Sequence, residues 1–132
     1  MELINAALDN CWPFLQTGLQ ANTPDIVKGS QFSITAVNPQ TVEITTSGGT
    51  PIPINRNAFL AALEYLVNNS HTTSANPCQI GSNFDNPSPL DSATRTGNQQ
   101  GNLMVVSYLI PLLSLMNLVD IDGTRPNTTW LK

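Results

Sequence analysis

Apolar side chains recur at three- and four-residue spacing in two stretches of the chain, residues 3–12 and 59–67. This spacing places them on one face of a helix, so it predicts two amphipathic helices. Pro13 has no N–H to donate and predicts a kink or a restart at the end of the first helix. Asn55 precedes the second helix and predicts its N-cap.

Between these helices the period changes to two, because apolar and polar residues alternate in residues 32–36 and 42–44. The Asn-Pro-Gln segment of residues 38–40 separates the two runs and predicts the loop of a β-hairpin. Residues 51–54 predict a further strand. Its two prolines cannot donate to a central ladder, which predicts a place at the edge of the sheet.

The second half of the chain begins with a polar run, residues 70–102, that is too long for an ordinary loop. Within it, Ser88 is a candidate N-cap and a proline follows at the first helical position, which predicts a short helix over residues 89–95. Residues 96–101 predict a turn. The apolar stretch of residues 102–117 predicts a long buried helix that its internal proline bends.

Strand alternation returns at the end of the chain. Residues 119–122 and 128–131 predict two strands, and the Gly-Thr-Arg-Pro segment of residues 123–126 predicts the turn between them. The result is a two-stranded ribbon directly after a helix.

Together these patterns predict one α+β domain over residues 1–132, with neither an internal repeat nor a linker. Residues 1–69 form a helix, a small antiparallel sheet and a second helix, and residues 87–132 form the helices and the ribbon. We expect the first helix and the sheet to pack on the helix of residues 56–68.

Charge is scarce in this chain. Charged residues make up 11%, against about 25% in soluble domains, while Ser, Thr, Asn and Gln account for 46 of the 132 residues. This composition excludes a polyelectrolyte tail, a strongly basic nucleic-acid clamp and a long charged coiled coil. The net charge of −4 opposes non-specific DNA binding. Three of the five cations are arginines, so the composition does not exclude a small local DNA-binding patch.

The cysteines and the N-terminus bear on the compartment. Cys11 lies on an apolar helical stripe and Cys78 in a polar loop, so we expect two free thiols. The start of the chain lacks the basic region of a signal peptide, which favours the cytoplasm. The apolar stretch of residues 103–119 contains polar residues and lacks basic flanks, so we expect a core helix and no membrane span.

The order of elements predicted over residues 89–131 resembles that of winged helix-turn-helix domains: a short helix, a turn, a longer helix and a two-stranded ribbon. In that family the second helix usually enters the major groove of DNA, and the ribbon, or wing, contacts the backbone. The resemblance covers about a third of the chain and concerns element order rather than a diagnostic motif. This chain departs from the family pattern because residues 103–116 contain no cation, so only the first turn of that helix could meet DNA.

Side chains that read bases gather in the predicted turn. Arginine bonds guanine, and asparagine and glutamine bond adenine through two hydrogen bonds. The N-terminus of the following helix favours phosphate, and the ribbon tip adds an arginine and an asparagine that could hold the DNA backbone. The alternative is a polar surface loop before a buried helix. The candidate nucleic-acid-binding residues are Arg95, Asn98, Gln99, Gln100, Asn102, Arg125 and Asn127.

Candidate catalytic groups are isolated. Asp25 and Glu43 resemble the acids of the restriction-type nuclease core, but Glu43 lacks the lysine two residues later that this chemistry needs. His71 has no strained nucleophile turn beside it. Asp120 and Asp122 share a strand face, as solvated carboxylates commonly do. One histidine and two distant cysteines have no metal-ligand spacing. We therefore expect no enzyme activity, no metal and no cofactor.

Two functions stay open. The first is a non-enzymatic DNA-recognition module, accessory to a DNA-processing or regulatory system, whose few contacts a two-fold homodimer would double. The second is a protein-binding adaptor or inhibitor that uses the amide-rich loop and exposed apolar residues. Trp12 or Trp130 would be its anchor if exposed. A small-ligand binder built around residues 70–102 is a third possibility, and the fold alone does not decide among them.

Overall fold

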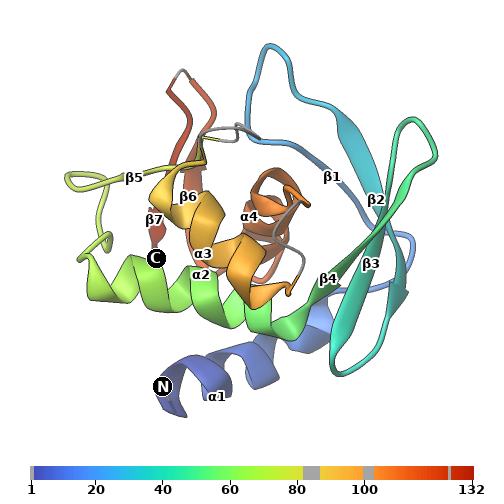
Figure 1. Ribbon diagram of the computed structural model, residues 1–132, viewed down its shortest axis with the longest axis horizontal. Helices are drawn as coiled ribbons and strands as arrows, with labels where there is room; N and C mark the ends of the chain where they lie inside the picture. The colour runs from blue at the N-terminus through green and yellow to red at the C-terminus, as the bar shows by residue number, and fades with distance from the viewer. Residues whose placement is uncertain (1, 82–86, 100–102, 125) are drawn as a thin grey trace.

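The structure is a computed structural model of the chain, and it describes residues 2–81, 87–99, 103–124 and 126–132. Helices and strands are distributed over the whole chain (Figure 1). In chain order they are α1 (Glu2–Cys11), the 3-10 turn η1 (Trp12–Phe14), β1 (Gln20–Asn22), β2 (Gln31–Val37), β3 (Thr41–Thr46), β4 (Pro51–Asn55), α2 (Arg56–Asn68), β5 (Cys78–Gln79), α3 (Pro89–Gly97), α4 (Val106–Leu115), β6 (Val119–Asp122) and β7 (Thr128–Leu131).

The strands form two antiparallel sheets, which confirms the α+β class. The first sheet has the order β1-β2-β3-β4, and the second has the order β5-β7-β6. Strand β4 lies at an edge, as its prolines predicted, because only one side of it has to supply hydrogen bonds. The ribbon of β6 and β7 also forms as predicted.

Side-chain caps start α2 and α3 where the sequence predicted them. The side chain of Asn55 accepts a hydrogen bond from the N–H of Asn57 at 2.8 Å. The hydroxyl of Ser88 accepts one from the N–H of Asp91 at 3.1 Å, with Pro89 at the first helical position. Each cap satisfies a backbone donor that has no partner within the helix.

One strand was not predicted, and two predicted boundaries are wrong. Strand β5 lies inside the polar run of residues 70–102 and adds a third strand to the ribbon; two residues are too few to show a period. Helix α3 continues to Gly97 instead of ending at residue 95. Helix α4 begins only at Val106, after irregular residues 103–105, and Val105 provides no side-chain cap.

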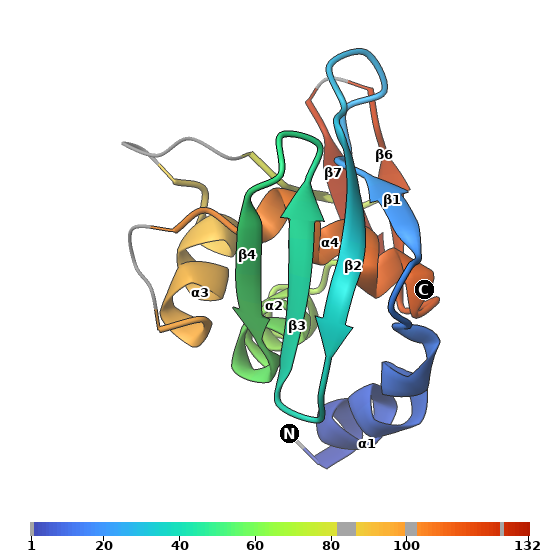
Figure 2. The same cartoon turned by 90° about the vertical axis from the view of Figure 1, so that its right-hand side faces the viewer.

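Helix α4 lies at the centre of the molecule. Figure 1 shows it between the β1–β4 sheet and the β5–β7 side, with α2 and α1 below. Figure 2 shows the same sheet covering α4 and α2 from the front. Tyr108 of α4 meets Phe32 of β2 edge to face, with ring centroids 5.3 Å apart. The predicted packing of the sheet on α2 is therefore incomplete, because α4 lies behind the sheet as well.

One apolar core joins the two halves of the chain. Its buried side chains come from α1, the β1–β4 sheet, all three later helices and β6. Helices α2 and α3 pack closely because Gly97 has no side chain: a Cβ there would lie 2.6 Å from the carbonyl oxygen of Asn57. Within the described part of the chain, no helix is long and apolar enough to cross a membrane.

Candidate functional site

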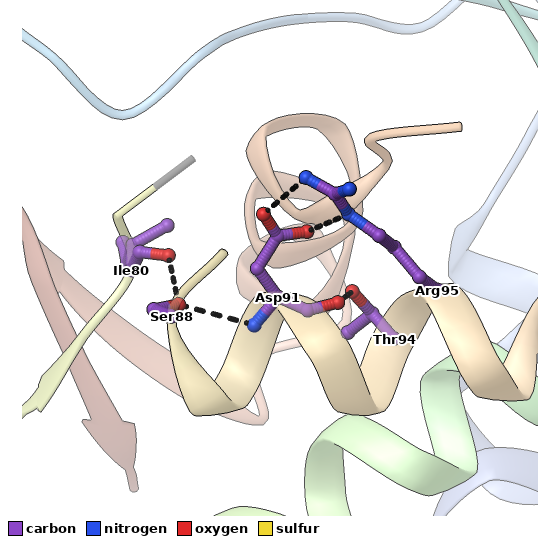
Figure 3. A network of polar contacts seen from close by, with 5 residues as sticks. All are labelled: Ile80, Ser88, Asp91, Thr94 and Arg95. Carbon is purple, nitrogen blue, oxygen red and sulfur yellow. Dashed lines mark hydrogen bonds and ion pairs between the residues drawn. The ribbon is translucent and has the colours of Figure 1, made fainter. Parts of the chain in front are cut away.

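Arg95, the first of the predicted DNA-binding residues, is buried. Its Nε donates to Asp91 Oδ1 at 3.0 Å and its Nη2 donates to Asp91 Oδ2 at 2.9 Å (Figure 3). Arg95 is 6% exposed and Asp91 is 0% exposed. This corrects the expectation that Arg95 contacts bases. The carboxylate of Asp91, four residues earlier, holds the guanidinium inside the protein, where the two charges form an ion pair.

The Asp91–Arg95 ion pair belongs to a larger network that fastens α3. The hydroxyl of Ser88 donates to the carbonyl of Ile80 at 3.1 Å, which links the start of α3 to the segment after β5. The hydroxyl of Thr94 donates to the carbonyl of Asp91 at 2.8 Å. Figure 3 shows these contacts along one face of α3. Their arrangement stabilises the helix and offers no open surface for a ligand.

The amides after α3 divide into a structural one and an exposed one. Asn98 is 3% exposed; its side-chain oxygen accepts from the N–H of Asn55 at 2.6 Å, and its side-chain nitrogen donates to the carbonyl of Pro53 at 3.3 Å. It therefore joins α3 to the start of α2. Gln99 is exposed, with a φ of 60°. Gln100 and Asn102 lie outside the described residues.

The tip of the β6–β7 ribbon lies away from the C-terminal end of α3. Arg125 is outside the described residues. Asn127 is half-buried, and with its side-chain amide turned so that the nitrogen faces them, it donates to the carbonyls of Gly123 and Thr124 at 2.9 and 3.1 Å. Asn127 therefore closes the turn. Figures 1 and 2 both place the C-terminal end of α3 and the β6–β7 hairpin at different ends of the molecule. The described residues of these two segments therefore do not lie on one shared surface.

The helix expected to approach DNA is covered. On α4, Val106 and every residue from Leu109 to Leu113 are buried, and only Ser114 and Leu115 are exposed. The β1–β4 sheet occupies the side that carries Tyr108. Most of α4 therefore lies in the core, as the sequence predicted for all of this helix except its first turn.

A surface that the sequence did not single out lies on the loop of residues 23–30, here called the apolar loop. Thr23 closes it twice: its N–H donates to the carbonyl of Ser30 at 2.9 Å, and its hydroxyl accepts from the N–H of Ser30 at 2.7 Å. Asp25 Oδ1 accepts from the N–H groups of Val27 and Lys28 at 2.8 and 3.0 Å. These bonds define the shape of the loop.

The apolar loop is also fastened to the β6–β7 hairpin. The N–H of Ile26 donates to the carbonyl of Gly123 at 3.1 Å. Gly123 must be a glycine, because a Cβ would collide with the Ile26 side chain and lie 2.5 Å from the carbonyl oxygen of Pro24. Despite these contacts, Ile26 and Val27 are 73% and 81% exposed. The sequence did contain a signal for this surface, namely two adjacent β-branched residues within a polar connecting segment.

A hollow of about 500 Å³ adjoins the loop. Its wall includes Asn22 at the end of β1, part of the apolar loop, and Ile121 of β6. Asp122, which directly follows Ile121, accepts hydrogen bonds from the hydroxyl and the N–H of Thr124 at 2.6 and 3.0 Å. These bonds lower the pKa of the Asp122 carboxyl, so it is ionised at neutral pH.

The other reactive or aromatic groups have structural roles. Burial raises the pKa of the Cys78 thiol to about 11, which leaves little thiolate at neutral pH. The ring of His71 stacks on Tyr65, and its Nδ1 lies 2.9 Å from the carbonyl of Asn76. Trp12 is 9% exposed and packs in the core instead of serving as an exposed anchor. Over the described residues, no group of three His, Cys, Asp or Glu side chains could hold a metal ion.

Comparison of this chain with known proteins identifies no relative whose function could be compared with it. No protein-family model, no curated protein and no solved structure shows significant similarity to this chain, so its function has to be inferred from its own residues.

Proposed function

We propose that the protein is a non-enzymatic protein-interaction module that binds through the apolar loop. The observation that carries this proposal is the exposure of Ile26 and Val27, 73% and 81%, on a loop held by hydrogen bonds at both ends. A loop already held in one shape loses little conformational entropy on binding, and two aliphatic side chains gain from leaving water. Both terms favour association with another protein surface.

Charge and burial support a protein partner over DNA. The chain carries a net charge of −4, and its buried Arg95 is engaged with Asp91. Non-specific affinity for DNA comes from cations that release counterions, and few are exposed here. An apolar surface in an acidic, charge-poor chain instead suits a protein.

Site-specific photo-cross-linking tests the proposal. A benzoylphenylalanine placed at Val27 in the full chain, expressed in cells, is expected to form a covalent adduct with a protein on irradiation. The matched control replaces Leu3, which is 86% exposed on α1 and lies away from the loop. Adducts from position 27 and none from position 3 would support the loop as the binding surface. No adduct from position 27, or equal yields from both positions, would refute it.

A second candidate, DNA recognition, is favoured by chain topology. From α2 to β7 the elements run helix, strand, helix, helix, strand, strand, and the sheet order is β5-β7-β6. This order resembles that of winged helix-turn-helix domains over a longer stretch than the sequence pattern suggested. With α4 covered, the contact would come from the hairpin tip, where Arg125 is the candidate phosphate ligand.

Titration of fluorescent duplex DNA at low salt tests this second candidate. We expect Arg125→Ala to weaken binding at least threefold, because one phosphate contact is lost, while Lys132→Ala leaves it unchanged. Lys132 is the control because its ammonium already contacts Asn117 and Asp120. Absence of binding at protein concentrations of about 50 µM, within the usual non-specific range, would exclude DNA recognition.

A further inference from the structure

We infer that the partner of the apolar loop is a second copy of this chain, bound about a two-fold axis. This inference rests on the proposed function of the same loop and names its partner. The observation behind it is that the exposed side chain of Val27 directly follows a residue, Ile26, that lines a hollow. A two-fold interface uses the same patch on both subunits, so the patch must contain both the protruding group and the hollow that receives it.

The convex part is the exposed side chain of Val27, and the concave part is the adjoining hollow of about 500 Å³, with Ile26 and Ile121 in its wall. In a two-fold pair, Val27 of each copy enters the hollow of the other and contacts Ile121. The hollow is large enough for an aliphatic side chain, and its wall offers an apolar contact for it. Each apolar contact is made twice.

Charges on the patch have the same complementary arrangement. Lys28 is exposed directly after Val27, while Asp25 lines the hollow and Asp122 directly follows Ile121 of its wall. When Val27 enters the hollow of the other copy, Lys28 is carried toward these carboxylates. Attraction between a cation and carboxylates at the rim sets the orientation of the two copies more than it adds affinity.

The patch is small, so the dimer is expected to be weak and reversible. Interfaces below about 1,200 Å² of total buried surface belong to transient complexes. We therefore expect a reversible equilibrium between monomer and dimer.

Sedimentation velocity of the purified full chain tests this inference. The weight-average sedimentation coefficient of the wild type is expected to rise with concentration toward the dimer value. Val27→Asp should abolish the rise, because it puts a carboxylate into the hollow. The control Leu3→Asp, at an equally exposed position on α1, should leave it intact. Circular dichroism melting of both variants shows that the fold is retained. A wild type that stays monomeric throughout, or a Val27→Asp variant that still dimerises, would overturn the inference.

Charge reversal tests the orientation separately. Lys28→Asp and Asp122→Lys should each weaken dimerisation several-fold, and the double variant should recover it because the opposite charges meet again. Two weakened single variants without recovery in the double would overturn the two-fold arrangement. The proposed function is tested independently of self-association. If position 27 forms an adduct with a different protein while the wild type stays monomeric, the loop binds another protein and the inference of a dimer is rejected.

Discussion

Replacing Asp91 with alanine is expected to lower the free energy of unfolding by about 3–5 kcal/mol, because it leaves the buried guanidinium of Arg95 without its carboxylate. The cost of taking this cation out of water is then no longer offset by the attraction of that carboxylate. Urea unfolding followed by circular dichroism measures the change.

The ion pair between Arg56 and Asp9 is the control, because its carboxylate is exposed. Its oxygen–nitrogen distance is 2.8 Å, close to that of the buried pair, but the side chain of Asp9 is 70% exposed, while that of Arg56 is 12% exposed. Asp9→Ala is expected to cost less than Asp91→Ala, because Asp9 is largely hydrated in the folded protein and Arg56 keeps its hydrogen bond to the carbonyl of Asn5 at 3.3 Å. Equal losses in Asp91→Ala and Asp9→Ala would contradict the role assigned to burial.

Phe59→Ala is expected to destabilise the protein by about 3–5 kcal/mol. Phe59 is fully buried and meets Trp12 edge to face, with ring centroids 5.0 Å apart. Its removal costs the apolar transfer free energy and leaves a cavity between α2 and the end of α1. Urea unfolding again provides the measurement.

Phe14 provides the comparison for the same chemical change at the surface. It is 52% exposed, so Phe14→Ala is expected to change the free energy of unfolding by less than about 1 kcal/mol. If Phe59→Ala cost no more than Phe14→Ala, the packing described around Trp12 would be incorrect.

Local signals in the sequence were enough for most elements. The alternation of β2 and β3, the caps at Asn55 and Ser88, and the edge position of β4 each depend on a few neighbouring residues. Strand β5 could not be predicted in this way, because its two residues owe their conformation to β7, about fifty positions later.

The candidate site was harder to predict because it depends on burial and distant contacts. The spacing of Asp91 and Arg95 is that of an ion pair on one helix face, which the sequence does contain. Its burial, however, depends on the tertiary structure. The loop that exposes Ile26 and Val27 is likewise held by a hydrogen bond from the N–H of Ile26 to the carbonyl of Gly123, nearly a hundred residues away.

The central position of α4 has a consequence for biosynthesis. The β1–β4 sheet leaves the ribosome first, and its inward-facing side chains, including Ile34, Ile44 and Ile54, are apolar. Helix α4, which covers part of this face, is made about fifty residues after the sheet, since it begins at Val106. Until then the nascent chain presents that part of the apolar face without its cover, which is the kind of surface that chaperones bind and that aggregates when translation stalls.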